Sequence, residues 1–456
     1  MKNILDWSDY ENAGVGDAYA DIPKNGGNFA KAIAVCINSR HCEEKPKGVM
    51  CPSYRVSDNP LLSTGGRVRL LKAALNSEHP DSTICGEQLA QAMDLCVSCK
   101  GCKRECENEV DMAMIKIEYL AQRYKTHTPS LRTRLFAQLP ELLSNYRWLR
   151  TAINIRNRSS FLANLAEKTL GISANRILPQ PVARKFSVST KHSITANNKS
   201  IEKQVVLFVD TFTRNFEPQN AWAAMHVLRA GGYTVHIVEA TDENNKPLCC
   251  GRTQLAHGLV NEAKCKAQRV LTALEPYVDQ GMQVIGLEPA CLLAIRDDYK
   301  FLDLGELAQK TANQAVLFEE FVAKEHTAKR MKLALQALPD NQEPTLIHGH
   351  CHQKAVGAMK SMRKVLNLIP DFKFELIESS CCGMAGSFGL EKEHEKDSLA
   401  MAELSLLPTI RKKPQANIVA NGFSCRHQIK EGSQRQAVHI AVLLQQAMRP
   451  MDRVQP

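Results

Sequence analysis

Residues 345–352 read TLIHGHCH, an apolar strand pattern that ends at a cysteine between two histidines. A helical stretch and a second strand pattern, FKFELIES, lead from there to the pair Cys381-Cys382 and a glycine. The run IVANGFSC (418–425) completes the series with one more cysteine. Strand patterns that alternate with helical ones predict a parallel α/β layer. Ligands collect at the carboxyl ends of such strands, so these cysteines are predicted to meet there.

An earlier part of the chain repeats this series. KQVVLFVDTF (203–212) begins it, the strand pattern YTVHIVEA follows, and the pair Cys249-Cys250 again precedes a glycine. The run VIGLEPAC (284–291) aligns with the later IVANGFSC and also ends in a cysteine. The sequence therefore predicts two related α/β halves.

The two halves differ in their cysteines. Thr211 or a neighbour stands in the earlier half where the later half has Cys351. We therefore expect the later half to be the better metal or redox site and the earlier half to be the weaker one. The two sets are Cys351, Cys381, Cys382 and Cys425 in the later half, and Cys249, Cys250 and Cys291 in the earlier half.

Adjacent cysteines followed by glycine are an unusual ligand pattern. Two neighbouring thiols in regular structure cannot easily face one small ion, whereas an irregular cluster or a redox-active pair could use both, and glycine lets the backbone turn. Cys381 and Cys382 are accordingly interpreted as cluster ligands or as a redox pair. For the nearby histidines we keep three interpretations open, as ligands, proton carriers or hydrogen-bonded strand-end residues: His350, His352 and His427.

Residues 96–106 read CVSCKGCKREC, a C-x2-C-x2-C-x3-C spacing. Bacterial ferredoxins use this run, followed by proline, to bind [4Fe–4S] clusters, with the fourth cysteine serving the other cluster. Glu107 replaces the proline, which is not a ligand. A zinc site is the alternative, but three cysteines at three-residue steps fit a cluster better. The predicted ligands are Cys96, Cys99, Cys102 and Cys106.

A second, less complete set lies upstream. Cys36, Cys42 and Cys51-Pro52 have C-x5-C-x8-C-P spacing. By the crossover rule, Cys51 would join Cys96, Cys99 and Cys102, while Cys106 would join Cys36 and Cys42. The second cluster would then be [3Fe–4S], or [4Fe–4S] with a further ligand such as His41 or Cys85.

The predicted fold class is α/β, with an N-terminal all-α ferredoxin-like domain and a C-terminal pair of repeated α/β cysteine-rich domains. The connector is predicted to end in a linker rich in Ser, Thr and Asn, KFSVSTKHSITANNKS. The predicted divisions are 1–30, a loose lead-in; 31–126, the ferredoxin-type domain; 127–200, a basic helical connector and linker; 201–340, the first repeat; and 341–456, the second repeat.

Composition narrows the possible cellular location of the protein and the role of its cysteines. The 456 residues include sixteen cysteines, no export signal and no apolar run near the ~20 residues of a membrane span. We therefore expect a cytoplasmic protein whose cysteines serve metal or redox chemistry. The net charge of +10 is densest in 123–185, where Arg147-Trp148-Leu149-Arg150 could contact the inner face of the plasma membrane or a protein partner. No helix–turn–helix or stacking aromatic pattern occurs, so we expect no nucleic-acid partner.

Several motifs resemble one known family. CPSYRVSDNPLLSTGGRVRLLKAAL and MDLCVSCKGCKRECENEVDM resemble the iron–sulfur region of FAD-linked oxidoreductases of the D-2-hydroxyglutarate and D-lactate dehydrogenase type. They are also similar to the iron–sulfur subunits of glycolate oxidase and anaerobic glycerol-3-phosphate dehydrogenase. CCGRTQLAHGL, HGHCHQKA, SSCCGMAGSFGLEKEH and GFSCRHQI resemble the cysteine-rich (CCG) domains that follow there and that heterodisulfide reductase shares.

This resemblance implies an electron-transfer role. The cysteine motifs start by residue 36, so FAD is expected on a partner chain that oxidises D-lactate, glycolate, D-2-hydroxyglutarate or glycerol 3-phosphate. Electrons would leave through this chain to a quinone or another carrier, and the chain alone would be inactive.

Two alternatives remain. One is a thiol–disulfide oxidoreductase like heterodisulfide reductase, although the C-x-x-C ending of that family is replaced here by Gln428 after Cys425 and by Ala294 after Cys291. The other is an iron–sulfur sensor or binding module.

Overall fold

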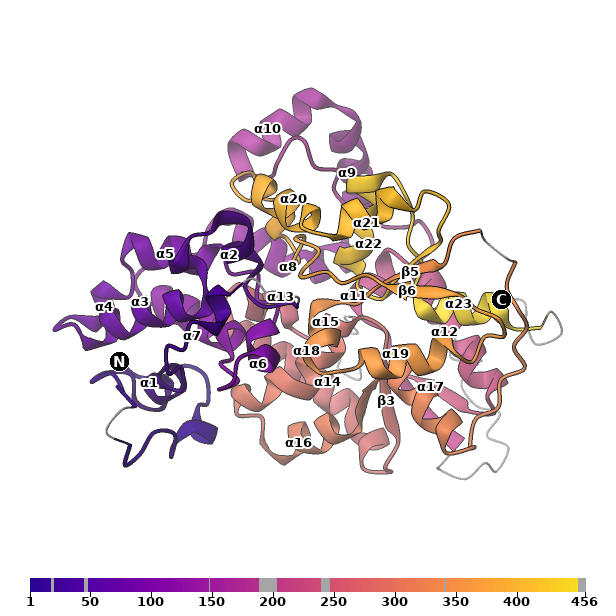
Figure 1. Ribbon diagram of the computed structural model, residues 1–456, viewed down its shortest axis with the longest axis horizontal. Coiled ribbons are helices and arrows are strands. Elements are labelled where there is room, and N and C mark those ends of the chain that lie inside the picture. Colours follow the sequence, from indigo (N-terminus) through magenta and orange to yellow (C-terminus); the bar gives the residue numbers. More distant parts are fainter. Residues whose placement is uncertain are drawn as a thin grey trace.

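The computed structural model describes residues 1–17, 20–44, 48–146, 148–187, 203–238, 247–339 and 342–449. Helices dominate, and two small sheets lie in the C-terminal half of the chain (Figure 1). Most of the predicted Ser/Thr/Asn-rich linker lies outside the described residues, and so does Arg147.

The described residues of 1–126 form helices and loops and contain no strand. A cap begins each of the two longest helices, because the side chains of Ser63 and Asp111 accept hydrogen bonds from the first-turn N–H groups of Gly66 and Met114. The α-helices are α1 (Gly27–Ala34), α2 (Pro52–Ser57), α3 (Thr64–Asn76), α4 (Pro80–Thr83), α5 (Glu87–Asp94), α6 (Gly101–Glu105) and α7 (Met112–Arg123), with 3-10 turns at Ser8–Tyr10, His41–Glu43 and Pro60–Leu62.

The first residues are packed, so the expectation of a loose lead-in is wrong for them. Trp7 is 2% exposed and its ring lies against Phe29 and Phe301. The buried carboxylate of Glu118 on α7 accepts hydrogen bonds from the backbone N–H groups of Ile4 (2.9 Å) and Leu5 (2.7 Å). An acidic side chain far along the chain thus fixes a segment whose own sequence is polar.

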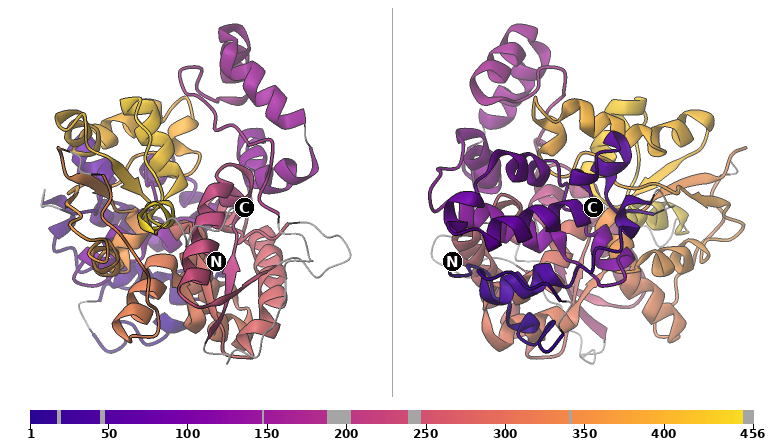
Figure 2. Two further views of the ribbon diagram at one scale, coloured as in Figure 1. Left: turned by 90° about the vertical axis from the view of Figure 1, so that its right-hand side faces the viewer. Right: turned by 60° about the vertical axis from the view of Figure 1, so that its left-hand side comes forward.

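A basic helical arm follows, residues 131–170, and its later part projects from the rest of the molecule (Figure 2). Its helices are α8 (Leu131–Asn145), α9 (Trp148–Arg158) and α10 (Ser160–Leu170). Large apolar side chains are unusually exposed here: Leu131, Tyr146, Trp148, Ile155, Phe161 and Leu165. None of the helices among the described residues is both long enough and apolar enough to span a bilayer.

The first sheet has four parallel strands in the order β2-β1-β3-β4. The strands are β1 (Gln204–Phe208), β2 (Thr234–Ile237), β3 (Gln283–Gly286) and β4 (Ala315–Leu317). The helices between and after them are α11 (Thr211–Asn215), α12 (Pro218–Ala230), α13 (Arg252–Ala256), α14 (Val260–Val278), α15 (Pro289–Leu293), α16 (Gly305–Gln314) and α17 (Phe318–Thr327), with a π-helical turn at Ala294–Asp298 and a 3-10 turn at Tyr299–Leu302.

The second sheet has three parallel strands in the order β6-β5-β7. The strands are β5 (Thr345–His348), β6 (Phe374–Leu376) and β7 (Ile418–Ala420). The helices are α18 (Cys351–Ala355), α19 (Met359–Leu366), α20 (Glu395–Glu403), α21 (Leu406–Lys412), α22 (Phe423–Ser433) and α23 (Ile440–Ala447), with a 3-10 turn at Phe388–Leu390.

The two sheets share one topology, and the predicted α/β class with parallel strands is confirmed. The order β2-β1-β3 corresponds to β6-β5-β7, and β4 is an additional edge strand of the first sheet. The halves also share a core, in which Ile285 of β3 belongs to the same apolar cluster as Ile347 of β5 and Ile440 of α23. Where the chain divides into domains stays a prediction.

A partly buried charge network joins three distant parts of the chain. Nε2 of His394 lies 2.7 Å from the carboxylate of Asp94 on α5, and its Nδ1 lies 3.1 Å from Glu391. Arg132 of the arm pairs with Glu391 at 3.2 Å. Burial alone would lower the pKa of His394, but its hydrogen bonds to Asp94 and Glu391 outweigh burial and raise that pKa to about 9. The imidazolium form therefore holds this junction together.

The junction predicts a pH dependence of stability. A pKa raised from 6.5 to about 9 contributes stability in full below pH ~6.5, and this contribution is lost as pH rises through 9. We expect the free energy of unfolding to fall by about 2 kcal/mol over that window, a value that already allows for the exposure of Asp94. Urea unfolding at pH 6.5 and pH 9.5 measures it. His394→Gln should flatten the difference, and an equally steep fall in that variant would contradict the assignment.

Candidate functional site

Four thiols from the N-terminal part surround one small cavity. Cys51 lines it together with Cys96, Cys99 and Cys102, which is the grouping that the crossover rule predicts. Ser98 and Lys100 adopt left-handed conformations with φ of 49° and 59°, so the loop turns sharply between its cysteines. At Gly101 a Cβ would lie 2.8 Å from the backbone nitrogen of Met50, so glycine is required where the loop meets Cys51.

The chemistry of these thiols fits a metal cluster. Burial raises the pKa of Cys51 to about 11 and raises the pKa values of Cys99 and Cys102 well above the ordinary range. Such thiols stay protonated in the free protein, and a bound metal displaces the protons. The sulfur of Cys51 also accepts a hydrogen bond from the backbone N–H of Thr64 at 3.1 Å, which stabilises a metal-bound thiolate.

Cys36, Cys42 and Cys106 form a second group. The thiols of Cys106 and Cys42 are close enough to Cys36 to raise its pKa, although burial is the larger cause. Gly65 donates its N–H to the sulfur of Cys42 at 3.2 Å. This is the predicted second set, and its three thiols are half-buried.

Cys85 and His41 are the two candidates for a fourth ligand of this group. Among the described residues, no hydrogen bond or ion pair links either of them to the three thiols. The thiol of Cys85 lies 3.8 Å from the carbonyl of Asp81 and 3.6 Å from the hydroxyl of Thr126. His41 is at the surface, where its Nδ1 lies 3.1 Å from Glu44. The choice between a three-iron and a four-iron cluster therefore stays open.

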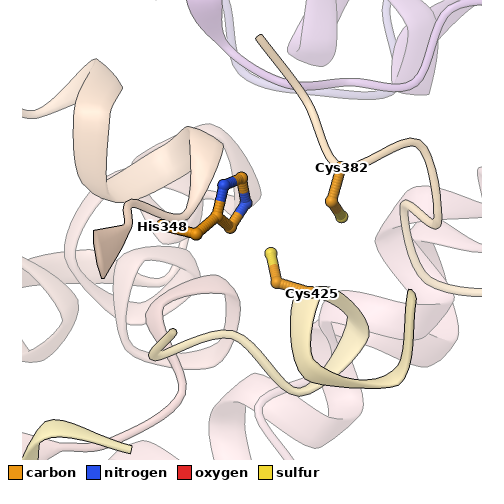
Figure 3. A group of neighbouring side chains, drawn as sticks. All are labelled: His348, Cys382 and Cys425. Atoms are coloured by element: carbon orange, nitrogen blue, oxygen red, sulfur yellow. The ribbon is translucent and has the colours of Figure 1, made fainter. Parts of the chain in front are cut away.

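In the second α/β half, the later one in the sequence, the cysteines lie together at the carboxyl ends of β5, β6 and β7. Cys351 begins α18 after β5, Cys381-Cys382 follow β6, and Cys425 lies in α22 after β7. His348, the last residue of β5, belongs to the same group (Figure 3). A nitrogen of His348 and the sulfur atoms of Cys382 and Cys425 all lie within 4.8 Å of one another, and all three side chains are buried.

The thiols of this group form a chain of neighbouring contacts, from Cys351 through Cys381 and Cys382 to Cys425. Hydrogen bonds from Cys381 and Cys425 lower the pKa of Cys382 well below its ordinary range, whereas the contacts of Cys381 with Cys351 and Cys382 raise its own pKa. Gly383 allows the turn, since it has φ of 84° and a Cβ there would lie 2.1 Å from the carbonyl oxygen of Ser398. This explains in physical terms why glycine follows the cysteine pair.

The three histidines identified from the sequence have hydrogen bonds to the backbone. Nδ1 of His350 accepts the N–H of His352 and caps α18. Nε2 of His352 lies 2.9 Å from the carbonyl of Ser98, and Nε2 of His427 lies 2.9 Å from that of Ile177. His348 was not among the residues predicted from the sequence, although its position at the end of the apolar strand pattern before Cys351 was a signal that could have identified it.

The first half holds Cys249, Cys250 and Cys291 in a similar buried arrangement. Cys250 interacts with Cys249 and with Cys291. Thr211 begins α11 as Cys351 begins α18, and its hydroxyl interacts with Cys249. A hydroxyl thus occupies the place in this half that a thiol has in the second half.

The ferredoxin-type loop (residues 96–106) lies next to the cysteine site of the second half. We call this site the second CCG site, and it consists of Cys351, Cys381, Cys382 and Cys425. The thiol of Cys351 is close enough to Cys99 to affect its pKa. The carbonyl of Ser98 contacts Nε2 of His352, and the hydroxyl of Ser380 donates to the carbonyl of Val49 at 2.8 Å. Two sites far apart in the sequence therefore meet in the fold. One apolar cluster also includes thiols of both sites: Cys99, Cys381, Cys382 and Cys425.

Comparison with known proteins identifies relatives but no matching protein-family model. The chain is 24% identical to D-2-hydroxyglutarate dehydrogenase of Escherichia coli over 427 residues, covering 84% of this chain and 40% of that protein. It is 23% identical to the Pseudomonas putida enzyme over 470 residues, covering 92% and 44%. A further relative is one of the subunits of anaerobic glycerol-3-phosphate dehydrogenase of Escherichia coli, 25% identical over 343 residues, covering 73% and 82%.

These relatives confirm the resemblance that the motifs indicate. The chain spans about two fifths of the length of the D-2-hydroxyglutarate dehydrogenases it matches. It is related to dehydrogenases, which supports an oxidoreductase-related protein.

The grouping of the N-terminal thiols makes a testable prediction. Cys106→Ser should diminish the centre at Cys36 and Cys42, while Cys51→Ser should diminish the centre at Cys96, Cys99 and Cys102. Iron and sulfide analysis with electron paramagnetic resonance (EPR) on anaerobically prepared protein distinguishes the two losses. Cys265→Ser, at an exposed thiol outside all groups, is the control. If both variants lost the same EPR signal, the grouping would be wrong.

Proposed function

We propose that this chain is the iron–sulfur electron-transfer component of a flavin-dependent dehydrogenase. Its relatives are named as dehydrogenases or as part of one, which supports the oxidoreductase class. The FAD, and with it the oxidation of the substrate, belongs in this proposal to a partner polypeptide. The substrate is a 2-hydroxyacid such as D-lactate, glycolate or D-2-hydroxyglutarate, or glycerol 3-phosphate.

The observation that carries this proposal is the contact between the two cysteine sites. Ser98 lies between two of the predicted ligands, Cys96 and Cys99, and it touches His352, the residue after Cys351. The thiols of Cys99 and Cys351 interact electrostatically. A protein that only sensed or stored one cluster would not need a second cysteine site against the first. A relay does need it.

The residues that would hold clusters follow from the thiol groups. Cys51, Cys96, Cys99 and Cys102 would hold one [4Fe–4S] cluster, and Cys36, Cys42 and Cys106 would hold a [3Fe–4S] or [4Fe–4S] cluster. The CCG site of Cys351, Cys381, Cys382 and Cys425 would hold a further centre. When bound, such clusters supply single-electron transfer.

The surrounding protein supplies charge compensation. Arg67 is buried beside Cys51, and Lys116 donates to the carbonyl of Cys96 at 2.6 Å. Lys100 forms a buried ion pair with Asp298 of the first half. At the second site, Lys354 donates to the carbonyl of Ser379 at 2.6 Å. Cations near thiolate groups offset negative charge and favour the reduced state.

The disulfide-reductase alternative has weaker support. Cys381 and Cys382 are only 2% and 4% exposed, so an external disulfide cannot reach them in this conformation. Gln428, which stands where a C-x-x-C motif would have its last cysteine, is buried and bonded to Arg176 and to the carbonyl of Ser398.

The electron acceptor in this proposal is a quinone or another carrier. A cytoplasmic site, at the inner face of the plasma membrane, is supported by the basic arm, where Trp148 is 63% exposed. Tryptophan and arginine side chains together suit the interface of an anionic bilayer.

Reconstitution tests the proposed function. The isolated chain should not oxidise D-lactate, glycolate, D-2-hydroxyglutarate or glycerol 3-phosphate with an artificial acceptor. Joined to its flavoprotein, it should pass electrons to a quinone analogue. In stopped-flow experiments, Cys99→Ser should slow quinone reduction at least tenfold, because it removes a thiol at the contact between the sites. Flavin reduction by substrate should not change. Cys265→Ser is the matched control, and turnover by the isolated chain would refute the assignment.

A further inference from the structure

His348 has an unusual environment for a strand residue. It ends β5, all four residues of which are buried, and it is 1% exposed. Its Nδ1 lies 2.9 Å from the hydroxyl of Ser379. Its Nε2 is buried without a hydrogen bond of normal geometry in the described structure. A buried ring nitrogen without a partner costs free energy unless something binds it.

The unpartnered nitrogen faces the thiols of the second CCG site. In Figure 3 the ring of His348 points toward the space between Cys382 and Cys425, and the donor atoms of the three residues lie within 4.8 Å of one another. Sulfur and imidazole nitrogen are the donors that zinc and iron sites use. Three elements, β5, the loop after β6 and α22, bring these donors together.

The other ring nitrogen is held as a metal-bound histidine requires. Nζ of Lys354 donates to the hydroxyl oxygen of Ser379 at 3.0 Å, and the same oxygen can accept the proton of Nδ1. This arrangement leaves the lone pair of the imidazole on Nε2. Histidines that bind metals typically donate their other N–H to an oxygen in this way, which fixes the tautomer and the ring orientation.

We propose that His348 is a direct ligand, through Nε2, of the iron–sulfur centre at the second CCG site. The inference rests on the proposed function, which places a cluster there, and it deepens that function by adding an imidazole to the thiolates of Cys351, Cys381, Cys382 and Cys425. The site is then a mixed Cys/His centre. With the neutral imidazole of His348 as a ligand, the centre should have a higher reduction potential than with a thiolate at the same position.

The first half has neither an imidazole nor a thiol at the positions that correspond to His348 and Cys351. β1 ends at Phe208, three residues before Thr211, just as β5 ends at His348, three residues before Cys351. The first half therefore lacks both donors at matched places, and Phe208 is buried in the apolar core. The imidazole is present only in the half that has the full set of cysteines.

The test is pulsed EPR on protein labelled with 15N-histidine and prepared anaerobically. We expect a 15N hyperfine coupling on the signal of the second CCG site, which is identified as the signal that Cys425→Ser removes. His348→Cys should keep the iron of this site, lose the coupling and shift the midpoint potential to a more negative value. His348→Phe, which reproduces the residue found in the first half, should lose the metal of this site alone. His427→Asn, whose ring is bonded to the carbonyl of Ile177, should keep the coupling.

Each other outcome overturns the proposal. A CCG signal without 15N coupling, or a coupling that persists in His348→Cys, would remove His348 from the ligand set and leave the proposed function intact. If Cys425→Ser removed zinc rather than iron, or removed no metal, no cluster would exist at this site. That result would overturn this inference together with the cluster assigned to the CCG site, while electron transfer by the N-terminal clusters would still be testable in the reconstituted complex.

Discussion

Parallel pairing of β5 with β6 and β7 is the constraint on which the cysteine-rich site depends. In a parallel sheet every strand ends at the same edge, so residues after three different strands are brought together there. Cys351, Cys382 and Cys425 come from segments separated by dozens of residues, and each follows one of these strands. If the strands alternated in direction, the three thiols would lie at opposite edges of the sheet.

A second constraint places this edge against the N-terminal part. Gly101 lets the ferredoxin-type loop approach Met50, and Ser98 of that loop contacts His352 of α18. Lys100, in the same loop, is buried against Asp298 of the first half. Removing one partner of a buried ion pair is costly, commonly about 3–5 kcal/mol, so these contacts fix the relative positions of the cysteine sites. The geometry that would serve electron transfer is therefore also what holds the molecule together.

Much of this arrangement could be predicted from local sequence. The hydrophobic period, the motif spacing and the doubled cysteine pair predict the strands and their parallel direction. The C-x2-C-x2-C-x3-C spacing predicts the loop that carries three of the thiols lining one cavity. The packing of Trp7 could not be predicted, because Glu118, which binds the neighbouring N–H groups, is distant in sequence. His348 was missed for a related reason: its role depends on which way a strand-end ring turns, and only the positions of Ser379 and Cys425 determine that.

In the proposed function, the thiol group of Cys51, Cys96, Cys99 and Cys102 and the second CCG site form one relay. The most direct measurement is the EPR spectrum of the anaerobically reduced protein, recorded stepwise during a redox titration. Adjacent paramagnetic centres should interact, with broadened or split lines when both are reduced, and Cys425→Ser should restore the unperturbed signal of the ferredoxin-type cluster. Spectra that are the simple sum of independent centres at every potential would show that the two centres do not interact, and the proposed relay would be wrong.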